Sequence, residues 1–250
     1  MKNPLLLLTL LCLFFIPAKS QTWTPQGAGL FPNGYAIYSI SVPNDSVVWL
    51  IASVESAVQS GATGVPADHL PKVARTTDGG ETWQVHDVEE ALGRISFDIA
   101  ALDANTAWMT AQDYGSGPGR ALFKTVDGGV TWVKITGSIA SGVFVRLFDE
   151  QHIYAQNNLF KTWSVNGGQT WLLGTLNQYQ NGEFNVVVSG NNMADTKGDT
   201  VWVGTTNGRI VRSTGYGAST VFFDTGFPFI QCVTFKDHLQ GMLFWYDDVS

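Results

Sequence analysis

The chain has 250 residues and an excess of acid, with 14 Lys and Arg against 21 Asp and Glu and a formal net charge of −7. An acidic balance opposes binding to nucleic acid and to anionic membrane surfaces, which both attract basic proteins. Only two cysteines are present, Cys12 and Cys232; because Cys12 lies in the N-terminal segment that we expect to be cleaved (see below), the mature fold should have no intramolecular disulfide and must depend on packing.

Residues 1–20 are predicted to form a signal peptide. Lys2 supplies a positive start, Leu5–Ile16 is an apolar run too short to span a bilayer, and small residues precede Gln21. We expect cleavage after Ser20, a secreted or cell-surface location, and no membrane insertion after cleavage. Loss of the leader takes the 14 basic residues to 12 against 21 acids, a charge of −9. Cys232 then remains as a single cysteine, predicted to be a buried, inert thiol.

Short segments rich in β-branched and aromatic residues follow in pairs along the mature chain, each pair joined by a polar turn. This pattern predicts an all-β fold. The expected first and second strands are 36–42 with 47–52, 97–102 with 106–111, 143–148 with 152–155, 184–188 with 200–204, and 230–235 with 241–245. A third strand is expected after each of the first four pairs, at 72–76, 120–125, 159–164 and 209–213.

An aromatic residue recurs at one place in the second strands. Such a repeated slot predicts packing between neighbouring units and not a ligand platform. The slot is expected to hold Trp49, Trp108, Tyr154, Trp202, and then Phe244 or Trp245.

One eight-residue phrase recurs at the end of each third strand. It is Thr-Thr-Asp-Gly-Gly-Glu-Thr-Trp at 76–83, Thr-Val-Asp-Gly-Gly-Val-Thr-Trp at 125–132 and Ser-Val-Asn-Gly-Gly-Gln-Thr-Trp at 164–171, with a degenerate copy at 213–220. The key positions 78, 127, 166 and 215 are 49, 39 and 49 residues apart. A period of about 40–50 residues predicts stacked supersecondary units such as propeller blades.

The phrase itself predicts a hairpin turn. Asp-Gly and Asn-Gly favour turns with positive φ, and the Asp or Asn side chain is expected to accept hydrogen bonds from backbone N–H groups one or two residues on. Asn166 supports a structural role, because an amide cannot act as a carboxylate base. We therefore assign to the fold Asp78, Gly80, Thr82, Trp83, Asp127, Gly129, Thr131, Trp132, Asn166, Gly168, Thr170 and Trp171.

The phrase resembles the Asp-box, or BNR repeat, of sialidase-like propellers, sortilin-type receptors, photosystem assembly factors and some xyloglucanases. The resemblance implies a β-propeller of four-stranded blades, in which the box joins the third and fourth strands on the face opposite the ligand site. It implies little about function, because enzymes and binding proteins share the box. The chain also resembles secreted Bacteroidetes proteins, which often carry a C-terminal sorting domain.

Four nearly complete blades and the first half of a fifth are expected from 21 to 250. We expect this β-propeller domain to be incomplete at its C-terminal end and to belong to a larger propeller. The alternative is a closed five-bladed ring in which residues 21–24 supply the missing outer strand.

Candidate ligand-binding residues come from the loops and first-strand positions that should surround the central channel. The loops are 53–71, 112–120 and 191–199, whose length in a regular repeat is typical of functional segments. Among the arginines, those at 94 and 146 lie near first-strand positions. The candidate binding residues are Asp68, His69, Arg94, Asp113, Tyr114 and Arg146.

No catalytic set is recognisable. Sialidases of the resembled kind carry an Arg-Ile-Pro motif before the first box, and none occurs here; Arg94 follows the first box. The four histidines are far apart, so we expect no metal site and no cofactor. The leading hypothesis is a non-catalytic propeller that binds a protein or glycan. The alternatives are a glycoside hydrolase of sialidase or xyloglucanase type, with carboxylates from Asp98, Asp113 or Glu183, and an assembly factor of the photosystem kind.

Overall fold

The computed structural model describes residues 25–54, 65–113, 119–135, 144–157, 160–176, 178–180, 182–184 and 193–245. The predicted signal peptide, the predicted clasp at 21–24 and Tyr114 lie outside these residues. In the part of the chain so described, no helix is both long enough and apolar enough to cross a membrane.

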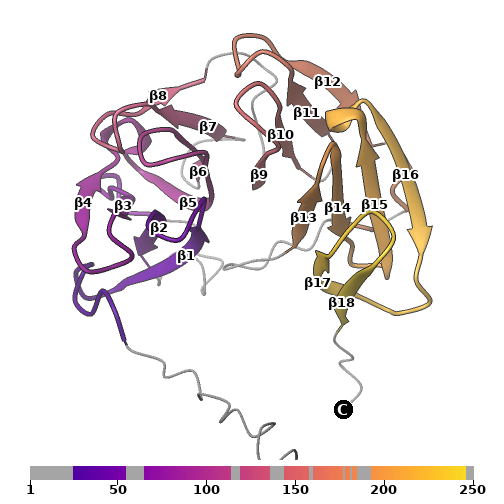
Figure 1. The fold of residues 1–250 in the computed structure, drawn as a ribbon, viewed down its shortest axis with the longest axis horizontal. Helices are drawn as coiled ribbons and strands as arrows, with labels where there is room; N and C mark the ends of the chain where they lie inside the picture. The colour runs from indigo at the N-terminus through magenta and orange to yellow at the C-terminus, as the bar shows by residue number, and fades with distance from the viewer. Residues whose placement is uncertain are drawn as a thin grey trace, which may run out of the picture.

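The described strands form five antiparallel sheets around a central axis (Figure 1). Blade 1 contains β1 (Tyr35–Ser41), β2 (Val48–Val54), β3 (Lys72–Thr76) and β4 (Gln84–Asp87). Blade 2 contains β5 (Arg94–Ala101), β6 (Ala107–Asp113), β7 (Arg120–Thr125) and β8 (Val133–Lys134). Blade 3 contains β9 (Phe144–Leu147), β10 (Ile153–Gln156), β11 (Phe160–Ser164) and β12 (Leu172–Thr175). Blade 4 contains β13 (Ala194–Lys197), β14 (Thr200–Gly204), β15 (Arg209–Thr214) and β16 (Ser219–Asp224), and blade 5 contains β17 (Ile230–Phe235) and β18 (Gly241–Trp245).

Within each four-stranded sheet the spatial order of the strands follows the chain order. The first strand of each blade therefore lies at one edge of its sheet, and in Figure 1 this edge faces the axis. The architecture is a partial β-propeller of four-stranded blades, which confirms the predicted all-β fold class. The described elements outside the strands include two short 3-10 turns, Glu89–Ala91 and Gly215–Gly217.

Neighbouring blades are joined by an aromatic ring that packs on a glycine. Trp49 of β2 packs edge-on against Trp132 of the next blade at 6.5 Å between ring centroids, and Trp108 packs against Trp171 at 5.9 Å. The second glycine of the phrase makes room for the ring. A Cβ at Gly168 would lie 2.2 Å from Cη2 of Trp108. The glycine of the phrase is therefore needed as much for the joint between blades as for the turn.

The fifth member of the aromatic slot differs from the prediction. The pairing of Thr234 with Met242 matches that of Arg146 with Tyr154, and the closing bond Lys236 N–H to Gln240 matches Phe148 N–H to His152. Met242, and not Phe244 or Trp245, therefore occupies the slot. Its side chain is 74% exposed, whereas Trp49 is fully buried.

The phrase closes its hairpin by a different bond from the one predicted. The side chain at 78, 127 or 166 accepts a hydrogen bond from the backbone N–H four residues on, at 2.9, 3.0 and 2.9 Å. The N–H two residues on is bound instead by the hydroxyl that opens the phrase, as Gly80 N–H is by Thr76 at 2.9 Å. The prediction of a one- or two-residue contact was wrong because this hydroxyl takes the nearer donor. The indole N–H of the tryptophan then returns to the second glycine, at 3.1 Å for Trp83.

The degenerate fourth copy keeps the turn and changes its bonds. Tyr216 takes a φ of 59°, and the N–H of Gly215, which corresponds to the N–H bound by the opening hydroxyl in the other copies, is instead accepted by the carboxylate of Asp199 at 3.1 Å. Gly217 still lies under the ring of the preceding blade, because a Cβ there would be 2.9 Å from Cδ2 of Tyr154. The contact between glycine and aromatic ring that joins the blades is thus kept, although the sequence of the phrase is lost.

The contribution of the Asp127 carboxylate to stability should be visible in how the stability of the protein changes with pH. Bonds from the hydroxyl and amide of Thr131 lower the pKa of Asp127 to about 2, from 3.8. Between these values the unfolded chain binds the proton more readily, so stability is lost as the pH falls. We expect Asp127→Ala to lower Tm by about 2–4 °C at pH 7, and the difference from wild type to shrink as the pH falls to 2. Asn166→Asp, which retains the acceptor, is the control and should change Tm little at pH 7; equal losses in both variants would contradict this role.

A pair of glycine substitutions separates the turn from the joint. Gly168 and Gly182 both have positive φ, 85° and 78°, but a Cβ at Gly182 meets nothing within 4 Å. Gly182→Ala should cost about 1 kcal/mol, because only the backbone is strained. Gly168→Ala should cost about 2–4 kcal/mol, since Trp108 must also move. Urea unfolding measures both, and equal costs would show that the ring does not rest on the glycine.

Candidate functional site

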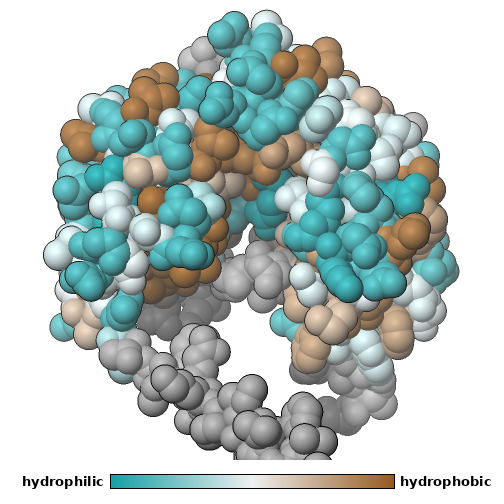
Figure 2. Space-filling model, viewed as in Figure 1, coloured by the Kyte–Doolittle hydropathy of each residue, from teal (hydrophilic) through white to brown (hydrophobic). Residues whose placement is uncertain are grey.

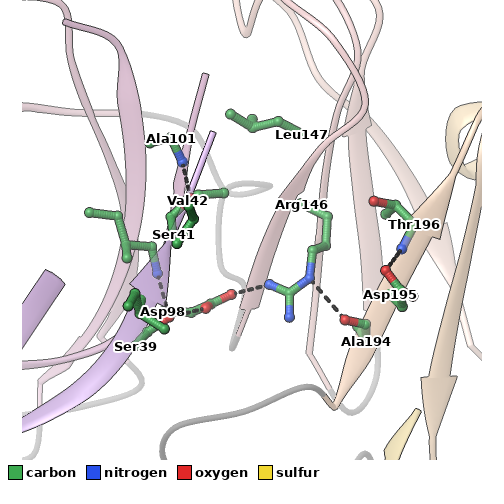
Figure 3. A pocket seen from close by; sticks show the side chains of 13 residues that line it. Ser39, Ser41, Val42, Asp98, Ala101, Arg146, Leu147, Ala194, Asp195 and Thr196 are labelled. Carbon is green, nitrogen blue, oxygen red and sulfur yellow. Dashed lines mark hydrogen bonds and ion pairs between the residues drawn. The ribbon is translucent and has the colours of Figure 1, made fainter. Parts of the chain in front are cut away.

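The inner strands of blades 1 to 4 enclose a cavity on the axis (Figure 3). Its volume is about 410 Å³ and its wall is largely polar. The lining residues are Ser39, Ile40, Ser41, Val42, Asp98, Ile99, Ala100, Ala101, Arg146, Leu147, Ala194, Asp195 and Thr196. Of the six binding candidates, Arg146 lies in this wall.

Asp98 of β5 is the centre of the wall's hydrogen bonds. One carboxylate oxygen accepts the hydroxyl of Ser39 at 2.8 Å. The other accepts the N–H of Val145 at 3.0 Å and the guanidinium of Arg146 at 2.5 Å. The pair is largely buried, with the side chains of Asp98 and Arg146 8% and 16% exposed. Asp98 therefore ties blades 1, 2 and 3 together.

Arg146 and Asp195 continue this set of bonds around the axis. Nε of Arg146 donates to the carbonyl of Ala194 in blade 4 at 3.2 Å, and Asp195 accepts the N–H of Phe235 in blade 5 at 2.6 Å. In blade 1, the hydroxyl of Ser41 accepts the N–H of Ala101 at 2.9 Å. Each side chain thus binds a backbone group on the open edge of the next blade's first strand. We call these bonds the edge caps.

Arg94 and Asp113 lie at adjacent ends of β5 and β6. Nη1 of Arg94 donates to the carbonyl of Gly119 at 2.5 Å, and Nη2 is 3.8 Å from a carboxylate oxygen of Asp113. Gly93 donates its N–H to the carbonyl of His69 at 2.8 Å. The structure therefore brings the start of β5 against the loop of Asp68 and His69, outside the lining of the axial cavity.

His69 is buried with its ring against Tyr35, whose hydroxyl oxygen is 3.4 Å from Nδ1. Burial, and then the charge of Lys72, lower the pKa of His69 below its ordinary value. Asp68, the neighbouring candidate, is exposed. Nothing in this geometry aligns His69 with Asp68 for a shared ligand.

Glu183, a candidate carboxylate of the hydrolase alternative, is fully engaged by its neighbours. Arg209 donates to both of its oxygens, Thr205 donates at 2.6 Å, and the N–H of Gln180 at 2.8 Å. Burial alone would raise the pKa of this carboxyl, but the bonds from Arg209 and Thr205 outweigh it and lower the pKa. An ionised, paired carboxylate cannot donate a proton as a general acid.

Sequence reasoning missed Ser39 and Asp195 as wall residues. Asp195 has no charged neighbour in the sequence except Lys197, and its main partner is a backbone N–H 40 residues away. The repeat could have revealed it, because Asp195 lies opposite the aromatic residue Trp202 just as Arg146 lies opposite Tyr154 in the preceding blade. No group of three or more His, Cys, Asp or Glu side chains that could hold a metal occurs among the described residues.

Comparison with known proteins gives no family model and no curated protein that matches the chain. Among solved structures, the chain is similar to YCF48 bound to D1 peptide, with 14% identity, a TM-score of 0.44, and coverage of 90% of this chain and 78% of that one. It is also similar to regucalcin, a calcium-binding protein of Agrobacterium tumefaciens, with 12% identity, a TM-score of 0.46 and coverage of 82% and 83%. An ancestral GH74 enzyme matches at 16% identity and a TM-score of 0.45, over 83% of this chain and 33% of that one.

Removing one member of the Asp98–Arg146 pair should destabilise the fold. Arg146→Met leaves a mostly buried carboxylate without its cation, and we expect a loss of about 2–4 kcal/mol in urea unfolding. Lys72→Met is the control, because the partner of Lys72, Asp87, is 41% exposed and such pairs contribute about 0–1 kcal/mol. Asp98→Asn combined with Arg146→Met should lose less than the sum of the two single changes. Strict additivity would show that the two side chains do not act as a pair.

Proposed function

We propose that this chain is a secreted, non-catalytic propeller of the Asp-box type that binds a partner protein at its axial cavity. The single observation that carries the proposal is the state of the cavity's carboxylates. Asp98 accepts bonds from Ser39, Val145 and Arg146, and Asp195 accepts the N–H of Phe235. Both therefore hold blades together and are not positioned for acid–base work on a substrate.

Several further features support binding of a protein over the alternatives. None of the residues that line the described cavity is aromatic, so the wall has no ring on which a sugar could stack. The wall instead offers hydroxyls, carboxylates, a guanidinium and backbone edges, which suit the polar main chain of a polypeptide. Secretion after cleavage at Ser20, the absence of a cofactor and a Bacteroidetes-type source are parts of the same proposal and rest on the sequence alone.

Site-specific photo-cross-linking tests where a partner binds. Benzoylphenylalanine is placed at Thr196, in the cavity wall, and separately at Val130, which is 58% exposed within a box turn. In the cells that produce the protein, we expect a protease-sensitive adduct from position 196 and none from position 130. Equal labelling from both positions, or no adduct from 196, would contradict binding at the cavity.

A glycosidase assay tests the non-catalytic part. We expect no turnover of a fluorogenic sialoside or of xyloglucan oligosaccharides, since Asp98, Asp113 and Glu183 each lie against an arginine and a glycosidase needs one protonated carboxyl beside one free carboxylate. Turnover that disappears in Asp98→Asn would make the protein a hydrolase. The same variant must first be shown to keep its cooperative unfolding, because Asp98 also supports the fold.

A further inference from the structure

A cation joins each of blades 1, 2 and 3 to the blade that follows it. In the first two joints, Nη1 of Arg75 donates to the carbonyl of Ala104 at 2.5 Å, and Nζ of Lys124 donates to the carbonyl of Gly167 at 3.2 Å. Both cations directly precede the hydroxyl that opens a phrase, and each lies over the slot ring of its own blade, 5.7 and 4.8 Å from the ring centroid. Both are partly exposed, so water still reaches the charge.

In blade 3 the cation lies two residues earlier in the strand and is buried. Trp163 holds the place of Lys124, and the cation is Lys161. The other four-stranded blades have an apolar residue at the place of Lys161, namely Val73, Leu122 and Ile210. Figure 2 shows hydrophilic residues over much of the face drawn, where a lysine keeps its hydration. Lys161 lies below the surface instead and is 5% exposed.

The amine of Lys161 reaches blade 4 with two hydrogen bonds. Nζ donates to the carbonyl of Gly217 at 2.5 Å and to Oγ1 of Thr220 at 2.6 Å. It also lies 5.2 Å from the centroid of the Trp163 ring. Gly217 is the glycine on which the ring of Tyr154 packs. Lys161 therefore belongs to the joint between blades 3 and 4.

No described carboxylate forms an ion pair with Lys161. The ionisable groups on the facing elements have other partners. They are Tyr154 with Gln156, Tyr216 with His152 and Asp149, and Arg209 with Glu183. Burial alone lowers the pKa of Lys161 to about 8, from 10.5, because no opposite charge offsets the lost hydration of the ammonium group.

We propose that Lys161 makes the joint between blades 3 and 4 pH-sensitive, so that the joint is stronger when the amine is neutral than when it is charged. Two hydrogen bonds need two N–H groups, and a neutral amine still has both. Release of the third proton to solvent therefore removes the cost of a buried charge and keeps both bonds to blade 4. Blade 4 also supplies Ala194 and Asp195 of the axial wall, so this joint holds one side of the cavity in place.

The direction of the pH dependence follows from the two protonation equilibria. Between about 8 and 10.5 the unfolded chain binds the lysine proton more readily than the folded chain does. The contribution of Lys161 to stability therefore rises with pH across this range and is lowest below it.

The first test compares the Tm of the full chain with that of Lys161→Met from pH 7 to pH 10. The two proteins share every other ionisable group, so the difference between their Tm values isolates Lys161. We expect wild type to gain about 2–6 °C relative to Lys161→Met over this range. Lys124→Met is the matched control, because Lys124 makes its bond in the preceding joint while partly exposed; its difference from wild type should change much less.

Carbon-13 NMR follows the same event in the wild-type protein, without a substitution in the joint. The Cε resonances of labelled lysines report the charge of each amine, and we expect one of them to titrate near pH 8. The carbonyl resonance of Gly217, which accepts the bond from Lys161, should shift with the same midpoint. The carbonyl of Gly167, which accepts from Lys124, should not shift with that midpoint.

The proposal is overturned if every lysine titrates at pH 10 or above, or if the carbonyl of Gly217 does not follow the lysine that titrates near pH 8. An equal Tm difference between wild type and Lys161→Met at pH 7 and pH 10 would overturn it as well. The NMR titration decides the matter if Lys161→Met does not fold.

Discussion

Unpaired backbone at the inner edges of the blades is the constraint on which the rest of the molecule depends. The first strand of a blade has one neighbour within its sheet, so half of its N–H and C=O groups face the axis and need hydrogen-bond partners from outside the sheet. Here a side chain from the preceding blade supplies the partner, as Asp98 does for Val145 and Asp195 does for Phe235. The polar residues of the wall therefore have a structural role, because they bind the backbone of the next blade.

Farther from the axis, neighbouring blades are held together by the contact between an aromatic ring and a glycine. This contact recurs between blades although their sequences differ. A ring fits over a glycine only when no Cβ is present, so each joint selects Gly in the turn of the following blade, as at Gly129 and Gly168. In blade 1 the corresponding glycine is Gly80, and the described residue closest to it is Gln26. A Cβ at Gly80 would lie 1.8 Å from Oε1 of Gln26, so a side chain of the segment before β1 packs on this glycine.

The fold could be predicted because its information is local and repeated: the eight-residue phrase, the short strand pairs and the aromatic slot lie within single blades. The site could be predicted only in part, because each edge cap joins residues from different blades. Ser41 and Ala101 are 60 residues apart, and Asp98 and Arg146 are 48 apart, with no motif that links them. Errors arose where two donors or two aromatic residues competed, and also in blade 4, where the strand that pairs with β14 is Ala194–Lys197 and not the predicted 184–188. The Thr76 hydroxyl displaced Asp78 from the nearer N–H, and the hairpin of β17 and β18 placed Met242 in the slot.

Native-state amide exchange on the free protein tests the role of the edge caps most directly. If side chains of neighbouring blades hold the inner edges, the amides of Ala101, Val145 and Phe235 should exchange only through large openings, close to the global rate. In the described part of the chain no side chain accepts the amide of Ile40, which lies at the same register as Val145, so this amide should exchange much faster, although its strand belongs to the same sheet as the buried β2. Equal rates for Ile40 and Val145 would contradict the caps and with them the interpretation of the axial wall.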